Sequence, residues 1–205
     1  MELRDAIYRR RMCRDYTDEP VAPEVLDRLL DLARRVPSAG YSQGFSFYVL
    51  EGEQTARFWD RTLPPDQRGV FRWPGLMRAP VIVLPLAHAD AYLERYREPD
   101  KANAGLGGTA DAWPIPYWYT DCAMAVQNLL LAATAEGLGA LYFGIFRNEA
   151  ELLGDLGVPD GHRPIGAVTI GWPTETARRS RAEASAAKRP RRPLAEIVQD
   201  RKSVV

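Results

Sequence analysis

The sequence predicts a single α+β domain, and three observations support this prediction. Residues 119–136 are apolar on nearly every side of an expected helix, which is typical of a helix buried in a large core or between subunits. Residues 79–87, APVIVLPLA, form a short continuous apolar run that is typical of a strand buried on both faces. No internal repeat or linker divides the 205 residues, so we expect one domain with one sizeable core over residues 1–205.

The N-terminal third is expected to contain two helices and a strand. A first helix is predicted over residues 3–11, where it ends in a cluster of arginines. A second helix begins near Pro23, because proline suits the first helical turn, and its apolar residues recur at helical spacing until Pro37 ends it. Residues 45–51, FSFYVLE, include aromatic and β-branched residues and predict a strand. Residues 53–78 predict alternating helical and irregular segments.

The second half of the chain continues this alternation. Residues 92–118 are punctuated by proline and glycine and lack periodicity, so we expect a mobile loop or lid there. The long apolar helix is followed by Gly137, a typical C-terminal cap residue. Two further buried strands are predicted over residues 140–146 and 164–173. From residue 174 to 205 the chain is basic and alanine-rich, which predicts an extended C-terminal arm that ends in a short helix.

Composition argues against several classes of protein. The formal net charge is zero, so no nucleic acid or membrane surface is indicated as a partner. Cys13 and Cys122 lack C-x-x-C spacing, which favours reduced thiols in a cytoplasm, and no run approaches the ~20 apolar residues of a membrane span. His88 and His162 are far apart and have no companions at ligand spacing, so no metal site is expected. If the protein is an enzyme, an organic cofactor would supply the chemistry.

An arginine cluster follows the first predicted helix. Residues 8–16, YRRRMCRDY, place four arginines within six positions. One interpretation is a solvated helix end, where cations also complement the helix dipole. The other is a phosphate site, because guanidinium groups bind phosphate oxygens bidentately.

Small and polar residues fill the connection between the second helix and the first strand. Ser38, Ser42 and Gln43 offer hydrogen-bonding groups, and Ala39 and Gly40 carry little bulk. Such a segment can bring its backbone close to a planar ligand. The alternative is an ordinary connection from a helix to a strand, which also favours glycine and serine.

Three segments contain glycine in patterns that are found at some ligand sites. The Gly-x-Gly at residues 137–139 precedes a strand and no helix follows it, which is the wrong context for a dinucleotide-binding motif. Residues 105–109, GLGGT, lack the Lys-Ser/Thr of a phosphate-binding loop and indicate only flexibility. Gly144 lies at the end of an apolar strand, where glycine often marks close approach by a ligand or another backbone.

The order of these segments resembles the nitroreductase family of flavin enzymes over nearly the whole chain. The matching stretches are RRMCRDYTDEPV, VPSAGYSQGFSFYV, RAPVIVL, DCAMAVQNLLLAATAEGLGALYFGIF and RRPLAEIV. The resemblance implies an α+β fold with a central mixed sheet flanked by helices. It also implies an intertwined homodimer that holds FMN at two interfacial active sites, each contacted by both subunits.

The resemblance also assigns roles to residues of this chain. The implied FMN contacts are Arg10, Arg11, Met12, Arg14, Pro37, Ser38, Ala39, Tyr41, Gln43, Tyr142, Phe143, Gly144, Ile145, Arg191 and Arg192. Residues 10–12 and the two late arginines would border the phosphate and ribityl chain. Arg14 would lie near the pyrimidine edge, where a cation stabilises the charge of the reduced ring. Residues 37–43 would serve the partner subunit, and residues 142–145 would lie along one face of the flavin.

Four residues depart from the family pattern. Met12 stands where many members have serine, Tyr41 replaces the usual asparagine, and Gly44-Phe45 replaces Pro-Trp. Tyr41, Trp113 and Tyr117 are candidate substrate contacts, although aromatic packing explains the latter two equally well. Tyr41 is the residue expected to distinguish this member from its relatives.

The implied activity is that of an FMN-dependent oxidoreductase. It would take hydride from NADH or NADPH and reduce a nitroaromatic, quinone or other conjugated small-molecule acceptor by a ping-pong mechanism, with no side chain acting as acid or base. Two alternatives stay open: a flavin-fragmenting enzyme like dimethylbenzimidazole synthase, and a flavin-storing or regulatory protein without turnover. The acceptor, the choice of nicotinamide and the involvement of a deazaflavin are left open as well.

Overall fold

Most of the apolar run at residues 79–87 lies in β2, Val81–His88, a central strand that pairs with three other strands. The computed structural model describes residues 1–179 and 189–198. In it β2 pairs with β1, Phe45–Glu51, on one side and with β5, Ala167–Gly171, on the other. β3, Gly139–Phe143, adds beyond β5 and gives the order β1-β2-β5-β3, while β4, His162–Pro164, pairs with the far end of β2.

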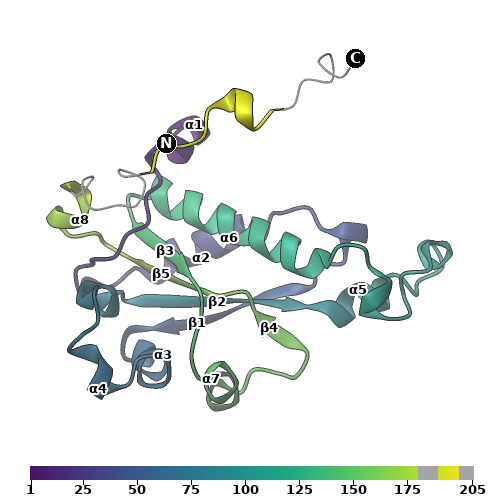
Figure 1. The fold of residues 1–205 in the computed structure, drawn as a ribbon, viewed down its shortest axis with the longest axis horizontal. Helices are drawn as coiled ribbons and strands as arrows, with labels where there is room; N and C mark the ends of the chain where they lie inside the picture. The colour runs from purple at the N-terminus through teal and green to yellow at the C-terminus, as the bar shows by residue number, and fades with distance from the viewer. Residues whose placement is uncertain (180–188, 199–205) are drawn as a thin grey trace.

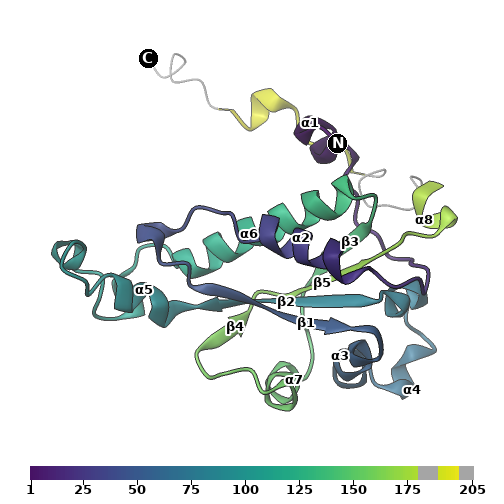
Figure 2. The same cartoon turned by 180° about the vertical axis from the view of Figure 1, so that it is seen from behind.

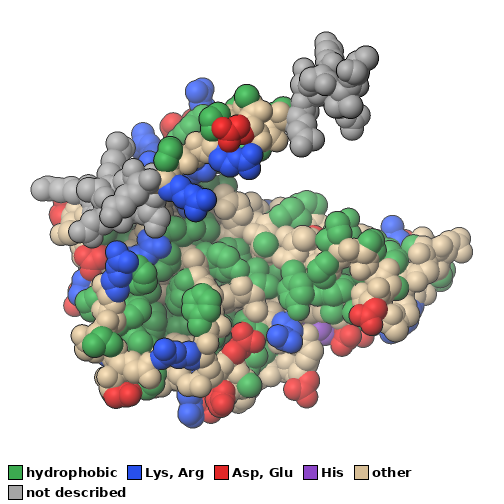
Figure 3. Space-filling model, viewed as in Figure 1, with side chains coloured by type: hydrophobic (Ala, Val, Ile, Leu, Met, Phe, Trp, Pro, Cys, Tyr) green, Lys and Arg blue, Asp and Glu red, His purple; other side chains and the backbone are tan. Residues whose placement is uncertain are grey.

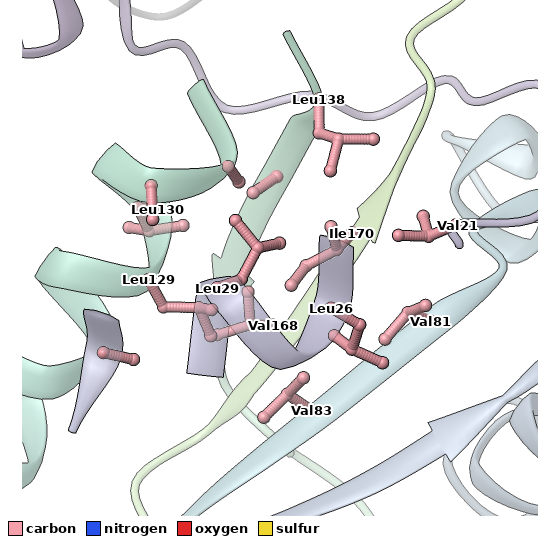
Figure 4. Packing of buried hydrophobic residues seen from close by; sticks show 14 of the residues in the cluster. Val21, Leu26, Leu29, Val81, Val83, Leu129, Leu130, Leu138, Val168 and Ile170 are labelled. Atoms are coloured by element: carbon pink, nitrogen blue, oxygen red, sulfur yellow. The ribbon is translucent and has the colours of Figure 1, made fainter. Parts of the chain in front are cut away.

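Both faces of this sheet are covered by helices (Figures 1 and 2). α2, Pro23–Ala33, and α6, Tyr117–Ala135, lie on one side, and Val81 and Val83 of β2 contribute to the buried cluster beneath them (Figure 4). α3, Thr55–Thr62, and α7, Glu149–Leu156, lie on the other side, and the alternate residues Ile82 and Leu84 belong to the second cluster. Because successive side chains of a strand point to opposite faces, the uninterrupted apolar run supplies both cores at once. The prediction of a strand buried on both faces is therefore confirmed.

The helices confirm most of the predicted positions. The observed helices are α1 Leu3–Arg9, α2 Pro23–Ala33, α3 Thr55–Thr62, α4 Pro65–Arg68, α5 Ala89–Arg95, α6 Tyr117–Ala135, α7 Glu149–Leu156 and α8 Glu175–Arg179. α1 ends two residues earlier than expected, and α6 begins two residues earlier. Gly137 follows α6 with a φ of 81°, and the next residue, Leu138, donates its N–H to the carbonyl of Ala133, at 2.9 Å. This is the cap geometry that glycine favours.

The expectation of a mixed sheet is wrong, although the α+β prediction is confirmed. All four strand pairings are antiparallel. The one isolated parallel bridge within the described residues joins Met12 to Ala140 at the outer edge of β3. Strands buried on both faces are typical of parallel sheets. Here helices cover both faces of an antiparallel sheet, so burial alone did not indicate strand direction.

Two predicted segments have more structure than their sequence indicated. Residues 92–118 begin within α5 and contain short 3-10 turns at Ala102–Ala104 and Ala110–Ala112. Within this segment Tyr92 and Trp113 are buried, whereas its mobility stays a prediction. Of the C-terminal arm, residues 174–205, the structure describes 174–179 and 189–198, which hold α8 and a 3-10 turn at Leu194–Glu196; the remainder lies outside the described residues.

Candidate functional site

A cavity of about 740 Å³ lies at the end of β3. Its walls come from four parts of the chain: α3, the stretch around α4, residue 14 and the end of β3 with the residues after it. Aromatic rings form much of the lining. Trp59 stacks on Phe143 with an interplanar angle of 4° and centroids 6.1 Å apart, and Phe58 meets both rings edge-on. These rings fix one another in offset arrangements that aromatic pairs favour, so the wall is rigid.

One polar atom in this wall lacks a partner. The indole N–H of Trp59 is buried and has no hydrogen-bond acceptor within the part of the chain that the structure describes. A buried donor left unpaired costs about 1–3 kcal/mol. Such donors are rare in folded proteins, and this one is covered by the protein itself rather than open to the cavity.

Among the residues that the structure describes, three arginines line the cavity and no aspartate or glutamate does. The guanidinium groups of Arg14 and Arg72 each lie 5.2 Å from the ring centroid of Trp73. Arg147 donates to the side-chain oxygen of Gln67. Among the described residues none of the three has a carboxylate within ion-pair distance, so their charges face aromatic rings and neutral amides. The cavity therefore favours a planar ligand with negative charge.

The structure brings five of the sequence-predicted site residues to this cavity: Arg14 and residues 142–145. A Cβ added at Gly144 would lie 2.7 Å from the ring of Phe146, which is 89% exposed and can shift. This contact therefore does not account for glycine at this position. The hydroxyl of Tyr142 donates to the carbonyl of Ile165, and burial raises the pKa of Tyr142. Tyr142 therefore stays protonated and holds the end of β3.

The predicted loop at residues 37–43 lies elsewhere. It is tied to α5, because Arg95 Nε donates to the carbonyl of Gly40 at 2.9 Å, and α5 and α4 lie at opposite ends of the sheet (Figures 1 and 2). Gly40, Tyr41 and Gln43 have φ values of 62°, 57° and 51°, a left-handed conformation that non-glycine residues rarely adopt. Tyr41 projects outward with 72% of its surface exposed. Within one chain, this loop does not reach the cavity.

A buried carboxylate of α6 holds the loop in this conformation. Asp121 is 2% exposed and accepts the backbone N–H of Ala39 at 2.9 Å. The same oxygen accepts the hydroxyl of Tyr92 at 2.7 Å. Burial, the hydrogen bond to Asp121 and its charge raise the pKa of Tyr92 well above its usual range, so its phenol remains a donor. Inside the loop, Ser38 Oγ accepts the N–H of Gln43 at 3.0 Å.

The arginine cluster after α1 lies outside the cavity, apart from Arg14. Arg10 is partly exposed, and Arg11 is exposed and donates to the carbonyls of Tyr8 and Arg10 at 2.6 and 2.9 Å. Met12 is 37% exposed, and its backbone pairs with Ala140 of β3. Neither the phosphate interpretation nor the solvated helix end is tested by these contacts.

The remaining predicted site residues are dispersed. Arg191 and Arg192 are exposed, and Arg192 Nε lies 3.2 Å from a carboxylate oxygen of Glu196. Trp113 is 7% exposed, packs edge-on against neighbouring aromatic rings and donates its indole N–H to the carbonyl of Leu106 at 2.9 Å. These contacts favour the packing interpretation of Trp113. Tyr117, at the start of α6, keeps 37% of its surface exposed.

Sequence reasoning missed several residues of the cavity and the acid that holds the loop. The cavity residues are Phe58, Trp59, Phe71, Arg72, Trp73, Phe146 and Arg147. For five of them the signal was the proximity of arginine to aromatic residues in VFRWP and GIFRN, whereas Phe58 and Trp59 follow Arg57 in RFWD. Asp121 was detectable as the single acid inside the most apolar helix. A charge in such a helix requires buried partners.

Comparison with known proteins agrees with the resemblance seen in the sequence. A model of the nitroreductase family matches residues 7–172. A protein of Archaeoglobus fulgidus, provisionally named an NADH dehydrogenase/NAD(P)H nitroreductase, is 27% identical over 172 residues, which are 82% of this chain and 84% of that protein. The family model spans most of the chain, so the chain belongs to the nitroreductase family.

Solved structures support the same fold. A nitroreductase family protein from Streptococcus pneumoniae TIGR4 superposes with a TM-score of 0.74 at 21% identity, covering 98% of this chain and 100% of that one. A provisionally named nitroreductase from Desulfovibrio desulfuricans, crystallised with FMN, gives a TM-score of 0.67 at 26% identity, with coverage of 98% and 96%. In the described ranges, residues 1–179 and 189–198, no helix has the length and apolarity to cross a membrane, and no His, Cys, Asp and Glu side chains cluster as a metal site.

Proposed function

We propose that this protein is an FMN-dependent oxidoreductase that takes hydride from NAD(P)H and reduces a nitroaromatic, quinone or other conjugated acceptor by a ping-pong mechanism. The observation that carries the proposal is the aromatic cavity at the end of β3, lined by three arginines that have no carboxylate partner in the described part of the chain. Family membership supports it, as do the Desulfovibrio relative crystallised with FMN and the Archaeoglobus relative named for NAD(P)H.

The lining of the cavity fits FMN. Its volume of about 740 Å³ lies within the ~300–1,000 Å³ of typical ligand pockets. The stacked pair Trp59 and Phe143 offers a flat apolar wall for a planar ring. The unmatched guanidinium groups suit the negative charge of a phosphate or a reduced ring.

The chain's own residues would bind the cofactor and shape the site. When bound, FMN would supply the two-electron chemistry, which is to take up hydride from the nicotinamide and deliver it to the acceptor. Residues 142–145 would lie along the ring, and Arg14 would stabilise the negative charge that reduction creates at the pyrimidine edge. Phe58, Trp59 and Phe143 exclude water from this side, which strengthens the effect of Arg14 because the local dielectric constant is low. Arg10, Arg11 and Met12, with Arg191 and Arg192, would border the phosphate.

Residues 37–43 would complete the cavity of a partner subunit in a homodimer. Their distance from the cavity of their own chain supports this arrangement (Figures 1 and 2). Large apolar side chains are also exposed on two helices, among them Ile7 and Tyr8 on α1 and Tyr119 and Met124 on α6, with 39–68% of their surfaces accessible. Hydrophobic side chains spread over much of the face that carries α6 (Figure 3). Uncovered apolar surface of this kind is typical of a subunit interface.

The proposal is tested with purified protein under anaerobic conditions. The protein should be yellow and release FMN on denaturation; NADH or NADPH should bleach it, and a quinone should restore the colour. Colourless protein that takes up no FMN would contradict the proposal. Bound flavin that no nicotinamide bleaches would instead indicate storage. Consumption of reduced FMN in air with release of a benzimidazole would indicate the flavin-fragmenting activity.

The double variant R10A/R11A tests the phosphate role of the arginine cluster. We expect a folded protein of unchanged oligomeric state that retains at least about tenfold less FMN, because two charge-assisted contacts to the phosphate are lost. R34A/R35A is the matched control, since both arginines are exposed and paired with Asp31 on α2. Equal flavin content in the two double variants would show that Arg10 and Arg11 form only a solvated helix end.

A further inference from the structure

The mouth of the cavity has an unusual combination of groups. Phe146 and Val70 line it and each exposes 89% of its surface, which is high for large apolar residues of a folded chain. Arg147 follows Phe146 on the segment between β3 and α7, and it contacts Gln67 of α4. An apolar ring and a guanidinium group therefore stand next to each other where a ligand would enter.

Arg147 differs from the other two arginines of the cavity. Arg14 and Arg72 both lie over the ring of Trp73, so an aromatic face takes up part of their electrostatic attraction. Arg147 has only a neutral amide as its side-chain partner among the described residues. A guanidinium group binds a carboxylate through two parallel N–H bonds, and exchanging an amide for a carboxylate gains charge assistance. Arg147 is therefore the arginine best placed to bind an anionic group on an incoming molecule.

We propose that the cavity selects conjugated acceptors that carry a carboxylate or similar anionic group on the ring. Arg147 binds the anionic group, and Phe146 covers the ring beside it. This inference rests on the proposed reductase function and narrows its substrate class. Its support is that no aspartate or glutamate among the described residues lines the cavity, so no carboxylate of the lining competes for Arg147 or repels the ligand.

The test compares two acceptors that share ring and nitro group, 4-nitrobenzoate and 4-nitrobenzamide. With saturating NADH, the wild-type kcat/KM should be higher for the carboxylate by about tenfold, the value expected for one charge-assisted contact. R147Q should lower this ratio at least fivefold, and R147K should restore part of it. R28Q, which removes an exposed arginine paired with Glu136, is the matched control and should keep the wild-type ratio.

Direct binding gives a second readout that needs no turnover. Trp59 and Trp73 line the cavity, so quenching of tryptophan fluorescence by each nitrobenzene reports its Kd. R147Q should weaken 4-nitrobenzoate relative to 4-nitrobenzamide in this titration, whereas F146A should weaken both. Turnover of both acceptors with equal kcat/KM, unchanged by R147Q, would overturn the inference and leave the reductase function intact. Absence of turnover with every acceptor and nicotinamide would overturn both.

Discussion

Removing the carboxylate of Asp121 should release the loop at residues 37–43 from the body of the protein. This carboxylate accepts two hydrogen bonds from groups far away in the sequence, the backbone N–H of Ala39 and the hydroxyl of Tyr92, at 2.9 and 2.7 Å. Three residues of the loop, Gly40, Tyr41 and Gln43, have positive φ. Such strain, of order 1–3 kcal/mol for each non-glycine residue, persists only while surrounding contacts hold the loop in place.

The size of the effect follows from those two contacts. A hydrogen bond to a charged group contributes about 1.5–3 kcal/mol, so Asp121→Ala could cost about 3–6 kcal/mol if the loop stayed docked over unpaired donors. Undocking of the loop relieves the unpaired N–H and the backbone strain, so we expect a measured loss of about 2–4 kcal/mol in the free energy of unfolding. Asp121→Asn keeps one carbonyl oxygen and should lose about 1–3 kcal/mol.

Two assays separate loss of global stability from release of the loop. Urea unfolding followed by tryptophan fluorescence gives the free energy of unfolding. Limited trypsin digestion reports the loop, because the bond after Arg35 leads directly into it. Coupling between D121N and Y92F in a double-mutant cycle should be about 0.5–3 kcal/mol. Asp111→Asn, an exposed acid in a nearby turn, is the control and should stay within about 0.5 kcal/mol of wild type. If the free energy of unfolding of D121A also stayed within about 0.5 kcal/mol of wild type and its digestion rate did not change, the reasoning would be refuted.

Two further predictions concern glycine packing and buried thiols. Gly44→Ala should lower the free energy of unfolding in urea by about 1–3 kcal/mol, because the new Cβ would lie 2.6 Å from the carbonyl oxygen of His88. Gly69 has open space around it, so Gly69→Ala is the control and should be neutral or slightly stabilising. Burial, and then the charge of Asp121, raise the pKa of Cys122 from 9.0 to about 12. Between those pH values the thiol is ionised in the unfolded chain but still protonated in the folded one. The free energy of unfolding should therefore keep the full contribution of this thiol below pH 9 and fall by up to about 1.4 kcal/mol per pH unit above it. C122A should show a shallower fall across the same range; an identical slope in both proteins would exclude this thiol as the cause.

The sequence alone located part of the secondary structure and indicated the family. The period of apolar residues located α2 and α6, and the continuous run at residues 79–87 located β2, because burial imposes its pattern locally on each helix or strand. The order of short motifs indicated the nitroreductase family, and comparison with known proteins confirmed it. Of the residues that the family resemblance assigns to FMN, Arg14 and residues 142–145 line one cavity, and their contact with FMN stays a prediction.

Only the tertiary structure decided which distant residues meet. Arg14 lies over Trp73, and Asp121 binds a loop 82 positions earlier in the chain; no local pattern encodes either pairing. The direction of the strands was also undetermined, because helices on both faces of an antiparallel sheet produce the same apolar run as a parallel sheet. The spacing of apolar residues indicates which faces of a helix or strand are buried. Which segments are neighbours depends on how the whole chain packs, and this packing placed Arg147, Phe146 and the loop around Tyr41.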